Sequence, residues 1–391
     1  MRKTLLIVLW LTVFVPIGAQ TSHRDSVLTQ ARYLKSIYRT DDAIESLAAL
    51  LQPGVMDEAV LAELADCHFQ NGAYEDASGT YFILSSLNPG SILYKIRMMQ
   101  SYYRLKAYPQ SIQAGQTVLQ LDSIPAVVSF VGDAFRQMDQ ADSALWYYRR
   151  ALAMKPMNEA VVAKAVNILI TKEDYDGAVA ITEPFLAEDP DNTTVAPLKG
   201  LALYRKGDYD PAIDVFQRQE DIGNDSYPIH YYLGQSYWHT QVIYRAEKEL
   251  EAAWQIDSTD ANLAYSIAAV KLEAFRSFDK EILPWLDKAW EMLRPDPVLA
   301  SRIQQQYGLA YYRWNFWDKA IEHYKEAYRY NPKNISTLST IAYCYENKKD
   351  YKQAIQWYEK YLKLARPGTQ GYEFASKSVA YLKGEVFMEE Q

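Results

Sequence analysis

The chain has 391 residues, of which 49% are apolar and 23% are charged, a composition typical of a globular protein with a large buried core. Its 32 tyrosines and its thinly spread 16 glycines and 16 prolines exclude a disordered or low-complexity chain. The net charge is −8 and no basic stripe is present, which argues against nucleic acid as a partner.

Residues 1–19 are predicted to be a secretory signal peptide. Arg2 and Lys3 form a basic start, a mostly apolar run follows over residues 5–15, and Ala19 supplies a small residue before the expected cleavage site. This run is shorter than the about 20 apolar residues that span a bilayer. We therefore expect an exported protein with no membrane span after cleavage. It would be periplasmic or secreted, and the alternative location is the periphery of the outer membrane.

The rest of the chain carries a repeated pattern of small, aromatic and proline residues. The pattern recurs at intervals of 33 to 38 residues and covers about residues 24 to 368 in ten repeats. One small position falls, from the first repeat to the tenth, on Ala43, Ala77, Ser111, Ala144, Ala178, Ala212, Ala246, Ile282 (the least clear), Ala320 and Ala354. A second falls on Ala31, Ala65, Met99, Gly132, Val166, Gly200, Gly234, Gly308 and Ala342, with the eighth repeat unclear.

This spacing resembles the tetratricopeptide repeat, a helix-turn-helix unit of 34 residues, in an exported bacterial form. The two small rows then correspond to positions 20 and 8 of the unit. The resemblance implies an all-α fold, a right-handed superhelical solenoid in which small residues let paired helices approach closely. A bulky residue at position 20 is expected to overpack the crossing of the two helices.

Interruptions in the register suggest how the solenoid is divided. Residues 20–260 hold repeats one to seven, 261–300 an irregular eighth repeat, and 301–368 repeats nine and ten. We expect the eighth repeat to form a bend, because its register gains residues and prolines crowd it. Residues 369–391 are predicted to form a C-terminal capping helix and a tail, because solenoids need to cover their last exposed core face.

The turn within the sixth repeat shows the expected helix boundaries. Gly207 is predicted to end the first helix, Asp210 to cap the second and Pro211 to lie in its first turn. An aromatic residue three positions before position 20 is expected in the turn between the helices. It recurs as Tyr74, Tyr108, Tyr175, Tyr209, Trp317 and Tyr351.

No motif for catalysis or cofactor binding is found. The sequence lacks HExxH, paired CxxC, a glycine-rich phosphate loop and a GxSxG elbow. Of the five histidines, only His230 and His239 share a predicted helix, where nine residues place them on opposite sides. We therefore predict that the protein is not an enzyme and has no catalytic residue, no cofactor and no metal site.

In the tetratricopeptide family, the first helix of each repeat lines a concave groove, mainly through positions 2, 5, 9, 12 and 13. The resemblance therefore implies a partner-binding set consisting of Tyr103, Arg104, Arg136, Tyr204, Arg205, Tyr231, Trp238, His239, Tyr312, Arg313 and Tyr343. An aromatic ring beside a guanidinium offers a flat apolar surface and a fork of donors to a peptide. The alternative is that the arginines are solvated and the aromatic rings pack between repeats.

These features predict a non-catalytic scaffold of the bacterial cell envelope that binds other proteins or peptide segments in an aromatic and arginine-lined groove. The alternative is a glycan-binding module of the envelope that stacks sugar rings on the same aromatic side chains. Nucleic acid is not expected as a partner.

Overall fold

The computed structural model describes residues 17–292 and 296–389 and contains helices without strands in those ranges. The chain divides into two compact units between Lys172 and Glu173. Residues 1–16, which hold most of the predicted signal peptide, lie outside the described residues, and cleavage after Ala19 stays a prediction. Among the described helices, none combines the length and the apolar character that crossing a bilayer requires.

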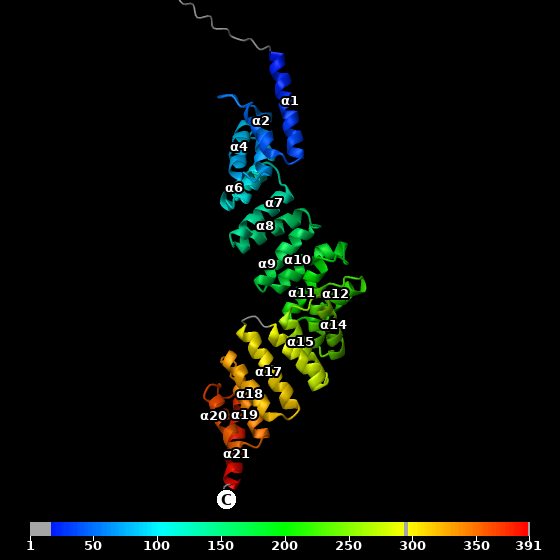
Figure 1. The fold of residues 1–391 in the computed structure, drawn as a ribbon, viewed down its shortest axis with the longest axis vertical. Helices are drawn as coiled ribbons and strands as arrows, with labels where there is room; N and C mark the ends of the chain where they lie inside the picture. The colour runs from blue at the N-terminus through cyan, green and yellow to red at the C-terminus, as the bar shows by residue number, and fades with distance from the viewer. Residues whose placement is uncertain (1–16, 293–295, 390–391) are drawn as a thin grey trace, which may run out of the picture. The chain divides into compact units, whose positions relative to one another are not determined.

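The N-terminal unit is a stack of antiparallel helix pairs (Figure 1). Its helices are α1 (Ile17–Ser36), α2 (Thr40–Ala48), α3 (Glu58–Gln70), α4 (Tyr74–Leu87), α5 (Ile92–Arg104), α6 (Tyr108–Leu121), α7 (Pro125–Gln137), α8 (Ala141–Met154) and α9 (Glu159–Thr171). Each helix packs on the next one in the chain, so the core is a continuous row of short-range contacts.

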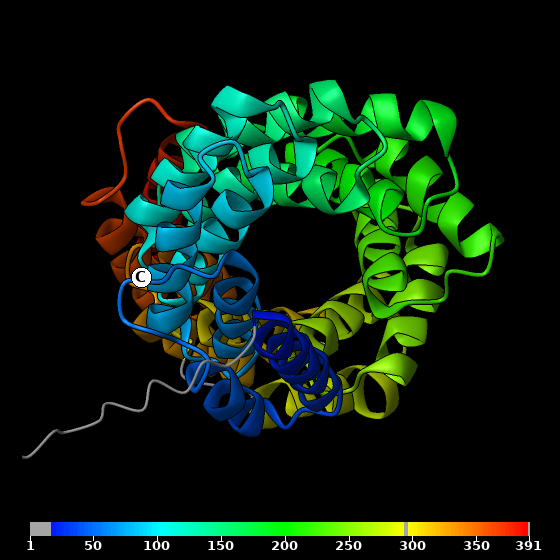
Figure 2. The ribbon, with the colours of Figure 1, turned by 90° about the horizontal axis from the view of Figure 1, so that it is seen from above.

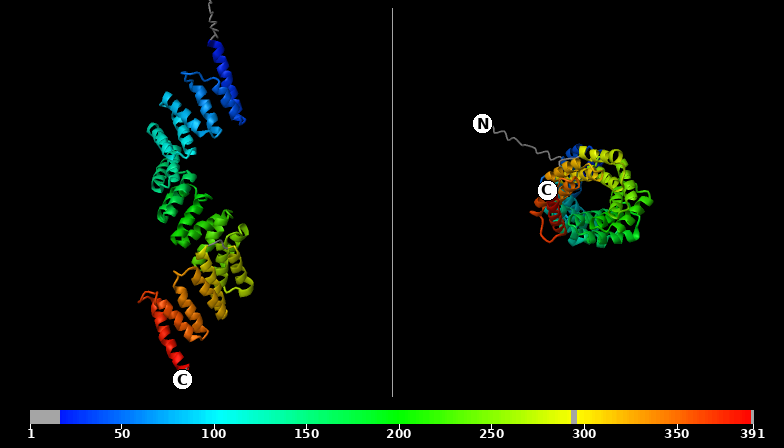
Figure 3. Two further views of the ribbon diagram at one scale, coloured as in Figure 1. Left: turned by 60° about the vertical axis from the view of Figure 1, so that its left-hand side comes forward. Right: turned by 90° about the horizontal axis from the view of Figure 1, so that it is seen from below.

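The C-terminal unit continues the same design. Its elements are α10 (Tyr175–Glu188), α11 (Val195–Lys206), α12 (Tyr209–Asp221), α13 (Tyr227–His239), α14 (Ile243–Ile256), α15 (Ala261–Glu273), the π-helix η1 (Phe278–Ile282), α16 (Leu283–Glu291), α17 (Pro297–Arg313), α18 (Trp317–Tyr330), α19 (Ser336–Asn347), α20 (Tyr351–Leu362) and α21 (Gln370–Glu389). Within this unit the helix pairs stand side by side in chain order (Figures 2 and 3). The first helices α11, α13, α15 and α17 also contact one another along one side. The predicted all-α repeat solenoid is confirmed.

Position 20 of the repeat is fully buried throughout. All ten residues of this row, from Ala43 to Ala354, are 0% exposed, and the eighth, Ile282, is no exception. The predicted register is therefore confirmed. In most repeats this position holds alanine, because the two helices cross so closely there that no side chain larger than a methyl group fits.

Position 8 meets position 24 of the same repeat. A Cβ on Gly200 would lie 2.7 Å from the ring of Phe216, and one on Gly308 would lie 2.9 Å from the ring of Tyr324. The same contact recurs between Gly132 and Tyr148. Glycine at these positions lets a large side chain from the second helix lie flat against the backbone of the first.

Two sequence expectations about the turns need correction. The aromatic residues expected in the turn instead begin the second helices: Tyr74 begins α4, Tyr209 begins α12 and Tyr351 begins α20. Gly207 does end α11 with a left-handed φ of 93°, as predicted. Asp210, however, does not cap α12, because the helix already begins at Tyr209 and Asp210 lies in its first turn. The second helix therefore begins two residues earlier than the sequence pattern suggested, with Asp208 at the N-cap position.

The eighth repeat differs from the others at its turn. After Phe275, whose φ is 51°, the second helix opens with the π-helix η1 and continues as α16. A π-helix places one more residue in a turn than an α-helix, and α17 runs for 17 residues, so both features lengthen the repeat interval here. Lys271 and Arg276 both bind the carboxylate of Glu247, at 2.7 and 2.8 Å, and hold this turn against α14. The predicted bend stays a prediction.

The last helix, α21, packs on α20. Ala375, Val379 and Leu382 are buried against Tyr358 and its neighbours. These three residues recur at four- and three-residue steps, so they form one stripe of the helix. The opposite side of α21 is exposed.

Candidate functional site

A hollow of about 430 Å³ lies in the C-terminal unit, on the side where the first helices contact one another. Four consecutive first helices contribute to it, α11, α13, α15 and α17. The lining residues are Tyr204, Tyr231, Gln235, Trp238, His239, Gln241, Asn262, Ser266, Glu273 and Arg302. Four of these belong to the set predicted from the sequence, so the structure brings part of that set together in one place.

The aromatic side chains of the hollow are held by neighbouring rings. The ring centre of Tyr204 lies 5.2 Å from that of Tyr232 and 6.0 Å from that of His239. The imidazole of His239 is stacked on Tyr209, with ring centres 4.2 Å apart and planes 2° apart. Rings that are already fixed lose little conformational entropy when a ligand packs on them.

Burial shapes the ionisation of these side chains. It raises the pKa of Tyr204 and, more strongly, that of Tyr231, so both phenols stay protonated at neutral pH. It lowers the pKa of His239, so the imidazole is neutral at pH 7. The aromatic part of the hollow therefore carries no charge and offers rings, hydroxyl groups and one imidazole.

The polar part of the hollow consists of amides, a hydroxyl group and two charges. Gln235 Nε2 donates a hydrogen bond of 2.8 Å to Ser266 Oγ, and both residues are buried. The guanidinium of Arg302 lies over the ring of Tyr265, with Cζ 4.6 Å from the ring centre. Glu273 supplies the only carboxylate among the residues that line the hollow.

Sequence reasoning missed Arg302, although a signal for it existed. Arg302 occupies position 2 of the ninth repeat, which is among the positions that line the groove in the tetratricopeptide family. Gln235 likewise occupies position 9 of the seventh repeat. Asn262 and Ser266 belong to the irregular eighth repeat, whose first helix could not be numbered from the sequence.

The remaining predicted residues of the C-terminal unit lie outside this lining. Arg205 is exposed at the end of α11. Tyr312 packs edge-on against Trp317 at 5.1 Å and lies 6.0 Å from Tyr343, and burial raises the pKa of Tyr312 to about 12. Arg313 donates a hydrogen bond to the backbone carbonyl oxygen of Leu272 and so ties α17 to α15. The guanidinium of Arg313 is thus engaged within its own chain.

The predicted residues of the N-terminal unit belong to different surroundings. Tyr103 packs against Tyr108 and Phe130, with ring centres 5.5 and 4.8 Å apart, which corresponds to the alternative of packing between repeats. Arg104 and Arg136 are exposed at the ends of α5 and α7.

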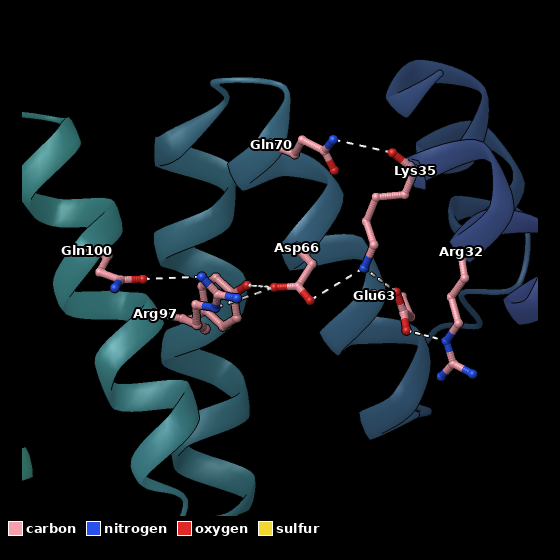
Figure 4. A network of polar contacts seen from close by, with 8 residues as sticks. Arg32, Lys35, Glu63, Asp66, Gln70, Arg97 and Gln100 are labelled. Atoms are coloured by element: carbon pink, nitrogen blue, oxygen red, sulfur yellow. Dashed lines mark hydrogen bonds and ion pairs between the residues drawn. The ribbon is translucent and has the colours of Figure 1, made fainter. Parts of the chain in front are cut away.

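A row of ion pairs crosses α1, α3 and α5 in the N-terminal unit, and sequence reasoning selected none of its residues for binding (Figure 4). Lys35 Nζ lies 2.7 Å from Glu63 Oε2 and 3.5 Å from Asp66 Oδ2. Arg97 Nε lies 3.8 Å from the other oxygen of Asp66, and Arg32 also binds Glu63. Both carboxylates of the row are already paired with lysine and arginine side chains of the same unit, so this surface offers less to a partner than the hollow does.

The row makes a pH-dependent contribution to stability. Burial alone would raise the pKa of Glu63, but hydrogen bonds from Lys35 and Arg32 outweigh it and lower the pKa. A carboxylate with a lowered folded-state pKa stabilises the fold above its unfolded pKa, and this stabilisation is lost as the pH falls through the folded value. Glu63→Gln should therefore cost about 1 kcal/mol of unfolding free energy at pH 7 and much less near pH 3.

Urea unfolding of the purified chain at pH 7, 5 and 3 measures this difference. Glu75→Gln is the matched control, because Glu75 is exposed in the first turn of the neighbouring helix α4 and should show a pH-dependent loss of only about 0.3 kcal/mol from the helix dipole. A loss that is equal at all three pH values would contradict an ionic role for Glu63.

Comparison with known proteins adds family and fold information. Two profiles of the tetratricopeptide repeat match the chain, one over residues 163–227 and the other over residues 317–371. A TPR repeat-containing protein of Methanocaldococcus jannaschii is 25% identical over 174 residues, which is 42% of this chain and 30% of that protein. The tetratricopeptide repeat protein 21 homolog of Caenorhabditis elegans is 24% identical over 176 residues. That match covers 43% of this chain and 13% of the nematode protein. The chain thus spans less than a third of the length of either relative.

Solved structures of similar proteins match at low sequence identity. A tetratricopeptide repeat protein from Parabacteroides merdae aligns with a TM-score of 0.43 at 13% identity, over 64% of this chain and 98% of that one. MamA from Desulfovibrio magneticus, resolved from residue 41 to its end, aligns with a TM-score of 0.40 at 15% identity. That alignment covers 43% of this chain and 94% of the solved MamA chain.

Proposed function

Because this chain is a tetratricopeptide-repeat protein, a class that serves in protein–protein interaction, we propose that it is a non-catalytic scaffold that binds a segment of a partner protein in the hollow of the C-terminal unit. The single observation that carries this proposal is the convergence of fixed aromatic rings, amides and one guanidinium from four consecutive first helices. Tyr204, Tyr231 and Trp238 are the residues from the sequence prediction that we place at its centre.

The size and chemistry of the hollow indicate the kind of segment it accepts. A volume of about 430 Å³ suits one or two side chains together with the backbone around them, and not a folded domain. The rings provide an apolar contact surface for an aromatic, proline or aliphatic side chain. Gln235, Gln241 and Asn262 provide amide groups that match the carbonyl and N–H groups of an extended backbone.

Arg302 supplies the positive charge among the lining residues of the hollow, and Glu273 supplies the negative one. Its guanidinium lies against the ring of Tyr265, and Gln306 Nε2 donates a hydrogen bond of 3.2 Å to the hydroxyl oxygen of Tyr265. A guanidinium held in this way pairs with a carboxylate at a smaller entropic cost than a mobile one. We therefore propose that the bound segment carries an acidic side chain next to its apolar anchor.

The test starts by recovering partners from the native envelope fraction by affinity purification and locating the bound segment with tiled peptides. Trp238→Ala and Arg302→Glu should each lower the affinity for that peptide at least tenfold in titration calorimetry, because central aromatic and arginine residues contribute most to such interfaces. Trp146→Ala is the matched control, since Trp146 is an exposed tryptophan of the N-terminal unit. Unchanged affinity in both hollow variants would refute the assignment.

The alternative, a glycan-binding module, rests on the same lining, because aromatic rings stack on sugar rings and amides bind their hydroxyl groups. A glycan array with the purified protein separates the two functions. A glycan signal that Trp238→Ala abolishes without loss of helicity would favour the module over the scaffold.

We also propose that the protein acts in the bacterial cell envelope. The support is the signal-peptide pattern of residues 1–19, with its basic start and apolar run. Amino-terminal sequencing of the protein from cell fractions tests this location. A mature chain that begins at Gln20 in the periplasmic fraction is expected, and an uncleaved cytoplasmic chain would refute it.

A further inference from the structure

One buried histidine and two glutamates converge in the C-terminal unit, although the sequence pattern predicted no metal site. Glu220 lies near the end of α12, His230 in α13 and Glu249 in α14. One ligand atom from each lies within 4.8 Å of the others. His230 is 7% exposed and Glu249 3% exposed, while Glu220 is half-buried and borders solvent. None of the three lines the hollow described above.

The ring of His230 lies between two carboxylates. Its Nδ1 is 2.8 Å from Glu249 Oε2, and its Nε2 is 3.9 Å from Asp225 Oδ1. Histidines that bind a metal through one ring nitrogen commonly direct the other nitrogen to a carboxylate or carbonyl group, which fixes the orientation of the ring. Asp225 lies on the Nε2 side of the ring, while Nδ1 faces Glu249.

A cation already bridges the two glutamates. Lys248 Nζ lies 2.9 Å from Glu249 Oε1 and 3.7 Å from Glu220 Oε1. The Lys248 side chain is 62% exposed, so it can move its ammonium group into solvent without disturbing the core. The cluster therefore favours positive charge at this point and offers a way for one cation to replace another.

We propose that Glu220, His230 and Glu249 form a site for a divalent transition-metal ion such as Zn²⁺, which displaces the ammonium group of Lys248 when it binds. One imidazole nitrogen and two carboxylate oxygens suit Zn²⁺ and its neighbours better than Ca²⁺ or Mg²⁺, which prefer oxygen donors alone. Water completes the coordination shell on the open side beside Glu220.

The site joins three successive helices, so an ion there stabilises the C-terminal unit. An ion that binds only the folded chain raises the stability in proportion to the logarithm of its concentration. Helix α13 carries His230 together with Tyr231 and Trp238, so the ion also stiffens the helix that contributes most residues to the hollow.

The experiment titrates the full-length mature chain, first dialysed against a chelator, with Co²⁺ and with Zn²⁺. We expect one equivalent to bind, with the visible absorption of Co²⁺ in a low-coordinate protein site, and a thermal midpoint that rises with Zn²⁺ concentration. Glu220→Gln should lower the Zn²⁺ affinity at least tenfold while the chain stays folded, because this residue borders solvent.

Two further variants distinguish a metal site from a simple ion pair. Lys248→Ala should raise the Zn²⁺ affinity severalfold, because it removes the competing ammonium group. His239→Ala, on the same helix, should leave the affinity unchanged. Absence of binding, binding that Glu220→Gln does not weaken, or Lys248→Ala without a gain in affinity would each overturn the proposal and leave an ion pair alone.

Discussion

Ala212→Trp should lower the thermal midpoint of the C-terminal unit by about 6–12 °C, corresponding to about 3 kcal/mol of unfolding free energy. Ala212 is 0% exposed at the crossing of α11 and α12, where it packs with Leu203, Phe216 and the helices that follow. An indole does not fit in that space, so the two helices must separate or the neighbouring side chains must leave their rotamers.

Circular dichroism of the variant during thermal unfolding measures this shift. Asp214→Trp is the matched control, because Asp214 is exposed on the same helix and accepts the same indole without displacing a core residue. We expect a change of only a few tenths of a kcal/mol for the control. If the two variants unfold at the same temperature, Ala212 does not lie at a helix crossing and the repeat register would be wrong.

Phe216→Ala should cost about 3–5 kcal/mol of unfolding free energy, because its ring is fully buried and its removal leaves a cavity beside Gly200. The partner residue provides a second measurement. In the wild type, Gly200→Ala places a Cβ 2.7 Å from the Phe216 ring and should destabilise the unit. In the Phe216→Ala background the ring is absent, so the same change should stabilise α11 by about 1 kcal/mol through helix propensity.

Urea unfolding of the two single variants and the double variant gives the coupling energy. We expect a coupling of about 1 kcal/mol or more, since residues in direct contact do not act additively. Additive effects within error would show that Gly200 is small for a reason other than the Phe216 ring. If Gly200→Ala stabilises the chain that retains Phe216, the conclusion is the same.

The fold was predictable because the repeat encodes it locally. Position 20 and the pairing of position 8 with position 24 involve residues within one helix pair, as for Gly200 and Phe216. Such contacts depend only on the length of the turn and the pitch of two helices, which the 34-residue spacing specifies. The predicted cap at Asp210 is wrong by two residues, because the pattern of turn residues does not show where the first hydrogen-bonded turn begins.

The candidate site was predictable only in part. Tyr204, Tyr231, Trp238 and His239 line one hollow, as their positions in the repeat suggested. The aromatic and arginine pairs at the ends of the first helices nevertheless differ in their surroundings: Arg205 is exposed, whereas Arg313 binds the backbone of Leu272, 41 residues away. The identity and the repeat position of a residue are the same in both cases, so the sequence pattern alone does not separate them.

The sequence by itself determined the helix pairs, their register and the first-helix positions that are available for binding, because all of these follow from contacts inside one repeat. Only the tertiary structure decided which of those positions meet in a hollow, that Arg302 joins them, and that Glu220, His230 and Glu249 lie together. Each of these groupings draws on different repeats or on both helices of neighbouring repeats. The distances between their side chains depend on how one helix pair stacks on the next, and a pattern confined to a single repeat carries no record of that stacking.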